Sequence, residues 1–189
     1  MEKSKKDLKL LFVKPCLRPG GFTKLLPVGL ACVMTYFETK GYDFTLLDID
    51  IDEYDDVYVE NYIKNNHFDI ILTGTIVTHY KWTKWFVNMT KKHQPDSKII
   101  VGNSVAGSIP EVFLEKTKAD IVVIGEGEIS AYEAAEAIRL GKDLKDVQGI
   151  AFKDNDRTVV KNAPRKVGNI NDFPFINWDH FDVERYISQ

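Results

Sequence analysis

Cysteine is scarce in this sequence, and long apolar segments are absent. The two cysteines, Cys16 and Cys32, lack the spacing of a metal site and are too few to build a disulfide framework. The apolar stretch after the charged N-terminal residues MEKSKKDLK is too short for a secretory signal or a membrane-spanning helix. We therefore expect a cytoplasmic protein with no membrane contact.

The chain also has no large net charge of either sign. The formal net charge is −3 at pH 7, which gives no electrostatic reason to expect nucleic acid or an anionic membrane as a partner. With 44% hydrophobic and 28% charged residues, the composition is ordinary for a globular protein. A chain of 189 residues is long enough for one domain with its own core and a small appendage.

Two common phosphate-binding motifs are absent as well. The loop after the first expected strand reads LRPGGFTKLLPVG (17–29), which lacks the G-x-G-x-x-G spacing of a dinucleotide site. The Lys-Ser or Lys-Thr pair that a P-loop places after its second glycine is missing from it too. At about a dozen residues this loop is nevertheless longer than most strand-to-helix connections, which indicates a function.

What the sequence does contain is a repeated alternation of short apolar runs and amphipathic stretches. The alternation predicts an α/β fold, because continuous apolar runs are typical of parallel strands buried on both faces. A flavodoxin-like (Rossmann-like), doubly wound, five-stranded parallel sheet is the simplest closure. Strands are expected at 8–14, 43–49, 68–74, 97–102 and 121–124, and helices at 28–41, 57–66, 80–93, 110–118 and 129–141.

The pattern changes near Gly149, so we expect a division of the chain there. Residues 149–162 predict a β-hairpin with Asp154, Asn155 and Asp156 at its turn. Residues 163–189 show little regular pattern and are interpreted as a connector that packs on something else. The expected units are an α/β domain over 1–148 and a hairpin with an irregular tail over 149–189.

Small residues follow three neighbouring strands at the edge where ligands bind in open α/β sheets. They are found in TGTIVTH (73–79), GNSVAGS (102–108) and GEGE (125–128). Such residues allow a ligand to approach backbone N–H groups closely. Ordinary tight turns would explain any one of these loops, but the set favours one extended ligand. Glu126 and Glu128 would repel a phosphate, so hydroxyls, amides or a ribose suit this edge better.

Several short sequence segments occur in a characteristic order along nearly the whole chain. The strongest combination is GEGE at 125–128 with the downstream GIAF at 149–152 and Phe173-Pro174. The series resembles the N-terminal cobalamin (B12)-binding domain of B12-dependent radical SAM enzymes. Further matching segments are PVGL at 27–30, GYDFTLLD at 41–48, FDIILTGT at 68–75 and KIIVGN at 98–103.

This resemblance implies a cobalamin site at the carboxyl ends of the strands. The corrin would lie over that edge, and the nucleotide tail would enter a groove near strands three to five. The residues implied at the corrin are Pro27, Val28 and Gly29. Those implied along the tail are Thr73, Gly74, Thr75 and Thr78, then Gly102, Asn103 and Ser104, and at its far end Gly125, Glu126 and Gly127.

The sequence departs from the family pattern at three points. Asn103 follows Gly102 where many members have a second glycine, although asparagine also adopts positive φ. The D-x-H-x-x-G motif that supplies a cobalt-ligating histidine in other branches is absent. No C-x-x-x-C-x-x-C motif is present, so S-adenosylmethionine and a 4Fe-4S cluster are expected only in a downstream radical SAM domain of a methyltransferase-like parent. Alone, these residues are expected to bind rather than catalyse.

Two other functions remain open at this point. A flavodoxin-like domain that has lost cofactor binding would serve a structural or docking role. An enzyme of similar fold that binds a nucleotide sugar or a flavin is disfavoured by the acidic GEGE segment and by the missing phosphate loop.

Three further features have ordinary explanations. His79 is interpreted as a solvent-facing residue at a helix start and not as a metal ligand. The stripe of Trp82, Trp85, Phe86 and Met89 predicts core packing or an interface. The acidic run is interpreted as a solvated loop, and its members are Asp48, Asp50, Asp52, Asp55 and Asp56.

Overall fold

The computed structural model describes residues 4–16, 21 and 24–188 and is built around one seven-stranded sheet with the order β2-β1-β3-β4-β5-β6-β7. The strands are β1 (Leu10–Lys14), β2 (Phe44–Asp48), β3 (Ile70–Gly74), β4 (Lys98–Gly102), β5 (Ile121–Val123), β6 (Ile150–Lys153) and β7 (Val159–Lys161). The helices are α1 (Val28–Thr39), α2 (Asp56–Asn65), α3 (Tyr80–His93), α4 (Asn103–Ser108), α5 (Pro110–Lys116), α6 (Glu128–Leu140) and α7 (Val183–Ile187).

The first five strands are parallel, which confirms the predicted flavodoxin-like sheet. Strand β1 lies between β2 and β3, and all five of its residues are buried. Alternate residues of each strand point to opposite faces. Thus Phe12 and Leu72 belong to one core cluster, whereas Leu11 and Ile71 belong to the other.

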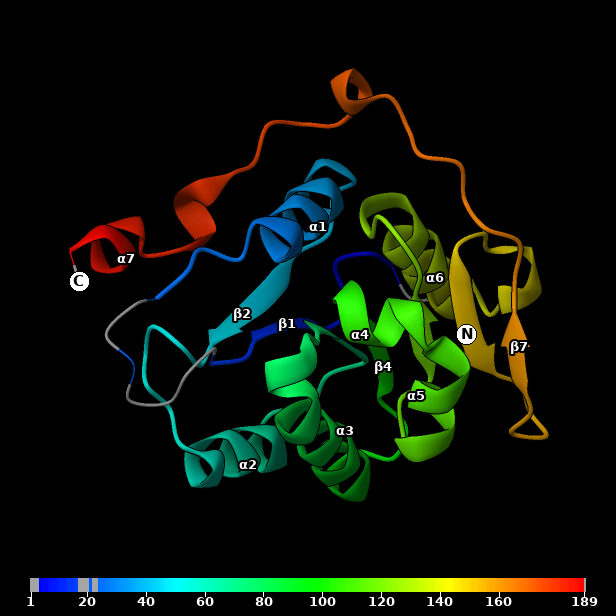
Figure 1. Cartoon of the computed structure of the whole chain (residues 1–189), viewed down its shortest axis with the longest axis horizontal. Coiled ribbons are helices and arrows are strands. Elements are labelled where there is room, and N and C mark those ends of the chain that lie inside the picture. Colours follow the sequence, from blue (N-terminus) through cyan, green and yellow to red (C-terminus); the bar gives the residue numbers. More distant parts are fainter. Residues whose placement is uncertain (1–3, 17–20, 22–23, 189) are drawn as a thin grey trace.

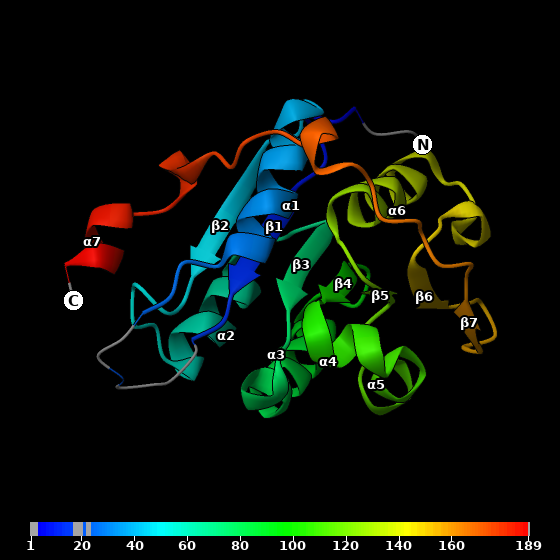
Figure 2. The same ribbon diagram turned by 45° about the horizontal axis from the view of Figure 1, so that its top comes forward.

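The two faces carry different numbers of helices, as Figures 1 and 2 show. Helices α1 and α6 pack with the cluster that contains Phe12, whereas α2, α3, α4 and α5 pack with the opposite cluster. The predicted Trp82–Met89 stripe contributes to that second cluster, with Phe86 and Met89 buried, so its interpretation as core packing is confirmed. None of the helices in the described ranges has the length and apolar character needed to cross a bilayer.

The predicted hairpin joins the main sheet and extends it from five strands to seven. Strand β6 pairs with β5 in antiparallel register, with Ile121 opposite Phe152, and β7 pairs with β6. Without β6, the short strand β5 would leave a row of backbone groups unpaired at the sheet edge. The hairpin therefore extends the sheet beyond β5 and covers its edge.

Helix α4 was not predicted, because its sequence, NSVAGS, contains weak helix formers. The helix is held by its neighbours instead. The Val105 N–H donates to the Thr75 carbonyl at 3.2 Å. Gly107 lies so close to β5 that an added Cβ would be 3.2 Å from the Val123 carbonyl oxygen. Tertiary contacts thus override local propensity here.

The tail after β7 packs on its own domain. It passes across the outer side of α1 and ends beside β2, on the far side of the sheet from β7 (Figures 1 and 2). The Asn177 N–H donates to the Thr35 hydroxyl at 2.9 Å, which fixes the tail to α1. At its end, the buried Tyr186 donates a hydrogen bond to Asp48, and Arg185 Nη1 lies 2.7 Å from Asp52 Oδ1.

We expect Tyr186→Phe to loosen this end of the tail. The change leaves a buried Asp48 oxygen without its donor, which costs about 1–3 kcal/mol. Urea unfolding measures the loss, and limited proteolysis should cut the variant first between residues 164 and 188. Tyr36→Phe is the control, since no hydrogen bond is recorded for the Tyr36 hydroxyl among the described residues. Equal stability of the two variants would contradict the structural role of the Tyr186 hydroxyl.

Candidate functional site

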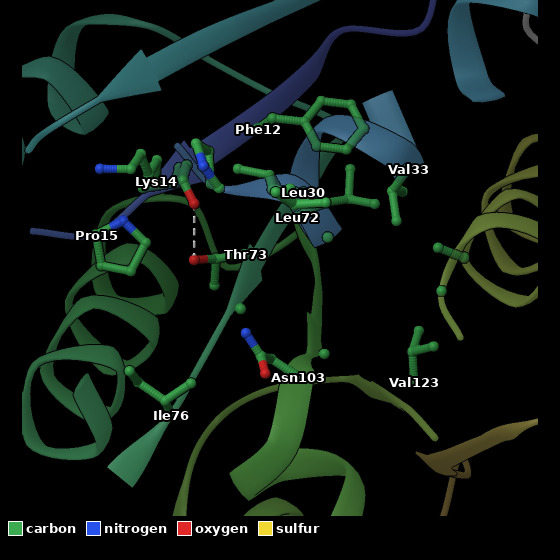
Figure 3. Close-up of a pocket in the computed structure, with 18 of the residues that line it drawn as sticks. Phe12, Lys14, Pro15, Leu30, Val33, Leu72, Thr73, Ile76, Asn103 and Val123 are labelled. Atoms are coloured by element: carbon green, nitrogen blue, oxygen red, sulfur yellow. Dashed lines mark hydrogen bonds between the residues drawn. The ribbon is translucent and has the colours of Figure 1, made fainter. Parts of the chain in front are cut away.

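A pocket with a volume of about 590 Å³ opens at the carboxyl ends of the parallel strands (Figure 3). This volume lies within the usual range for small-molecule and cofactor sites. Its walls come from β1, β3, β4, from β5 and the turn after it, and from α1 and α6. The described apolar lining residues are Phe12, Val13, Pro15, Leu25, Leu26, Pro27, Val28, Leu30, Val33, Leu72, Ile76, Ile100, Val123 and Ala131.

The pocket exists because two helices cover a broad sheet face. Phe12, Leu72 and Ile100 project from three neighbouring strands toward the layer of α1 and α6. Leu30 and Val33 approach from α1, and Figure 3 shows both above the strand that carries Leu72. These strand residues form the floor of the pocket and are themselves almost fully buried.

The Gly125-Glu126-Gly127-Glu128 segment turns the chain from β5 into α6. Gly125 has φ +79°, a left-handed conformation that favours glycine. A Cβ on Gly127 would lie 3.0 Å from Val33 Cγ2, so glycine there lets the start of α6 approach α1. Both glutamates line the pocket, and Glu128 Oε2 is buried without a hydrogen-bond partner among the described residues.

Asn103 occupies the turn between β4 and α4. Its φ is +74°, which confirms the expectation that asparagine replaces glycine at a left-handed position. Its Oδ1 accepts the Ser104 N–H at 2.6 Å. The side chain lies across the end of β3, where a Cβ on Gly74 would be 3.3 Å from Asn103 Cβ (Figure 3). The asparagine therefore narrows the pocket floor without disturbing the turn.

One end of the pocket is strongly polar. Lys14 Nζ and Asp50 Oδ2 are 2.5 Å apart, and both residues are buried. Burial opposes ionisation of Asp50, but the hydrogen bonds from Lys14 and Cys16 and the charges of Lys14 and Lys24 together outweigh it, and the pKa of Asp50 lies below its ordinary value. Lys24, from the loop before α1, is 3.5 Å from the other Asp50 oxygen. Asp50 thus stays ionised at the edge of the pocket.

The acidic run is therefore not simply a solvated loop. Asp48 and Asp50 are buried, and burial raises the pKa of Asp48 although Lys14 opposes it. Asp55 caps α2 by accepting the Tyr58 N–H. Within the described ranges no group of three or more His, Cys, Asp or Glu side chains is arranged to hold a metal ion.

His79 also differs from the sequence interpretation. It lines the pocket near Asp50 and Lys14, and its Nε2 is buried. The prediction that it faces solvent was wrong, because the side chain is partly buried against the pocket wall. Cys16 is partly buried and packs against the core.

Most of the residues implied by the resemblance meet around this pocket, and three do not. Thr75 is fully buried, with its N–H donating to the Gly102 carbonyl at 3.0 Å. Thr78 and Ser104 are exposed and lie outside the lining. Those on the lining are Pro27, Val28, Gly29, Thr73, Gly74, Gly102, Asn103, Gly125, Glu126 and Gly127.

Several lining residues were missed by sequence reasoning. Lys14, Asp50, His79 and Glu128 are among them. Glu128 belongs to the GEGE segment, but the resemblance implies no cofactor contact for it, and an acidic residue in a first helical turn also suits the helix dipole. The others carry no motif, and only the fold brings Asp50 of the segment after β2 beside Lys14 of β1.

A comparison with family models decides the family. Residues 23–135 match the B12 binding domain model, which is more than half of the chain. The chain belongs to the B12-binding domain family. The family's cofactor fits this pocket, because an apolar slot between two helices and a sheet accepts a flat aromatic base, and glycine backbone at Gly29 and Gly125 is open to contact.

Curated relatives of this B12-binding domain are longer proteins. It is 24% identical over 164 residues to an uncharacterised methyltransferase of Pyrococcus horikoshii, covering 85% of this chain and 35% of that protein. It is 21% identical to cytidylyl-2-hydroxyethylphosphonate methyltransferase of Streptomyces wedmorensis, covering 85% and 37%. An uncharacterised Methanocaldococcus jannaschii protein is 34% identical over 97 residues, covering 51% and 18%. The chain thus spans little more than a third of these relatives at most.

Solved structures share the fold of this B12-binding domain. The radical S-adenosylmethionine methyltransferase TsrM from Kitasatospora setae, with cobalamin and a [4Fe-4S] cluster bound, matches with a TM-score of 0.70 at 18% identity. That match covers 87% of this chain and 30% of TsrM. The cobalamin-dependent radical enzyme OxsB with aqua-cobalamin bound matches with a TM-score of 0.72 at 19% identity, covering 85% and 23%.

We expect Lys14→Met to destabilise the domain strongly. Removing the cation leaves Asp50 and Asp48 buried without their nearest positive charge, which costs about 3–5 kcal/mol. Chemical unfolding measures the change. Lys64→Met is the control, because the partly exposed Lys64–Glu60 pair should be worth only about 0.5 kcal/mol. A Lys14→Met loss no larger than that of the control would refute the structural importance of the buried pair.

Proposed function

We propose that this chain binds cobalamin, with the nucleotide tail in the pocket between α1 and α6 and the corrin over the carboxyl edge. The observation that carries the proposal is the apolar pocket of about 590 Å³ that opens on this edge in a member of the B12-binding domain family. Its apolar walls suit the base of the tail, and its polar mouth suits hydroxyl and amide groups.

The proposed roles follow from position. Pro27, Val28 and Gly29 begin α1 at the pocket mouth and would contact the corrin. The buried Glu128 oxygen would accept a hydrogen bond from a hydroxyl or amide of the tail. The residues proposed to follow the tail are Thr73, Gly74, Gly102, Asn103, Gly125, Glu126 and Gly127. Thr75, Thr78 and Ser104 would act only indirectly, through the loops they belong to.

Cobalamin would supply a cobalt centre for methyl-group chemistry when bound. The residues of this chain would hold and orient it and exclude water from its tail. We further propose that the parent is a cytoplasmic, cobalamin-dependent radical SAM methyltransferase, in which residues 149–189 lead from the domain over 1–148 to a radical SAM domain with S-adenosylmethionine and a 4Fe-4S cluster. The methyltransferase names of two relatives and the fold shared with TsrM and OxsB support this.

The pocket is not filled by large side chains, and this argues against a domain that has lost cofactor binding. Such a domain gains stability by filling an unused cavity with large side chains. Here Phe12 is the only phenyl or indole ring among the described lining residues, and the aromatic residues of the tail pack elsewhere.

Binding can be tested with hydroxocobalamin. The purified 189-residue chain should retain corrin absorption bands after desalting. Ala131→Phe places a ring on the α6 wall of the pocket and should weaken binding by about tenfold or more, which corresponds to about 1.4 kcal/mol. Titration by visible absorption measures the affinity.

The control is Val57→Phe, which introduces the same ring at an exposed position of α2 on the opposite face. Thermal unfolding of both variants checks that the fold is kept. Absence of corrin retention by the wild-type chain, or equal affinity of the two folded variants, would overturn the proposed site.

A further inference from the structure

Asn103 carries an amide donor that the described protein does not use. Its Oδ1 accepts the Ser104 N–H at 2.6 Å, and because an N–H requires an acceptor, this bond fixes which end of the amide is oxygen. No described residue accepts a hydrogen bond from the other end, Nδ2, and the side chain is exposed. The residue therefore has N–H groups available for a ligand.

The free nitrogen lies on the pocket lining between two central strands. Asn103 follows β4, and its Nδ2 is 3.5 Å from the position that a Cβ on Gly74 would take at the end of β3. Both residues line the pocket, and Figure 3 shows the amide turned toward the strand that carries Thr73. Since β3 and β5 lie on opposite sides of β4, the amide leans away from β5.

The carboxylates of the pocket lie on either side of this amide. Among the described lining residues they are Asp50, Glu126 and Glu128. Asp50 follows β2, whereas both glutamates follow β5, and β3 and β4 lie between these strands in the sheet. Because like charges repel, an anionic group in the pocket would avoid both ends. The ends of β3 and β4 are the place that remains for it.

The other lining side chains with N–H or O–H groups are committed or lie elsewhere. Lys14 Nζ is bonded to Asp50 at 2.5 Å and is buried. The Thr73 hydroxyl donates to the Val13 carbonyl at 2.9 Å. His79 is close enough to Asp50 to feel its charge, so it belongs to that acidic end. Among the described lining side chains, Asn103 is therefore the exposed donor without a partner.

We propose that Asn103 Nδ2 donates a hydrogen bond to the phosphate of the cobalamin tail. The proposal rests on the proposed function. In cobalamin the phosphate joins the corrin side to the ribose and the base. A base against Phe12 and Leu72 and a corrin over the carboxyl edge therefore leave the phosphate between them, at the level of the strand ends. Asn103 would position the tail with a neutral donor at a site where many family members have glycine.

An isosteric variant tests the direction of the hydrogen bond. Asn103→Asp keeps an oxygen for the Ser104 N–H and a side chain that tolerates positive φ, but it replaces the donor with a negative charge. It should weaken hydroxocobalamin binding by about tenfold or more, because a bond to a charged group is lost and a like charge is added. Titration by visible absorption measures the affinity.

A second variant removes the donor without adding a charge. Asn103→Gly also tolerates positive φ and should weaken binding by about threefold to tenfold. The control is Asn61→Asp, which adds the same charge at an exposed position of α2, on the opposite face of the sheet. It should bind as the wild-type chain does. Thermal unfolding checks that every variant keeps its fold.

Phosphorus NMR assigns the effect to the phosphate. Hydroxocobalamin is diamagnetic, and its only phosphorus atom is in this group, so each complex gives one ³¹P resonance. The resonance of the complex with Asn103→Gly should differ from that of the wild-type complex by more than the line width. The Asn61→Asp complex should match the wild-type position.

The possible failures are distinguishable. A wild-type chain that retains no cobalamin contradicts the proposed function itself. A wild-type chain that binds cobalamin while both Asn103 variants bind equally well overturns only the role of Asn103. Weaker binding with an unchanged ³¹P resonance also overturns it, because the amide would then serve a corrin amide or the ribose.

Discussion

The contact between Gly127 and Val33 determines the separation of α1 and α6, and the pocket depends on that separation. With a hydrogen in place of a side chain at Gly127, the start of α6 rests directly on α1. The two helices therefore support one another at this point, and the pocket lies beside this contact, against the sheet. A larger residue would push the helices apart, whereas a third helix on this face would fill the space. Close packing at one point thus creates open volume beside it.

The polar end of the pocket follows from a second constraint, which is the burial of several charges. Lys14 at the end of β1 meets Asp50 and Asp48 after β2, and Lys24 adds a further cation from the loop before α1. Burying such charges is tolerable only because each has a partner of opposite sign. The same network receives Tyr186 from the tail. The wall of the candidate site is in this way connected to the most distant part of the sequence.

The sequence predicted the five parallel strands well, because runs such as those around Leu11 and Ile71 are apolar without interruption. It also indicated which loops would meet, since parallel strands bring their carboxyl ends to one edge. It did not predict α4, which is held by contacts with Thr75 and β5 and not by its own residues. Nor did it predict that Asp50 and His79 face inward, because burial of a charge or of an imidazole depends on partners distant in the chain. Thr75 differs in the opposite direction. The resemblance implied that it contacts the cofactor tail, but its side chain is fully buried in the core.

The path of the tail has a mechanical consequence. Between β7 and α7 it crosses the whole width of the domain and is fastened at separate points, first near Thr35 and last at Asp48. A pulling force applied near residue 188 would therefore act first on the Asp48 attachment and then on each earlier one in turn. The load would therefore pass first to the end of β2 and then to α1, and the tail would come away from the domain in steps.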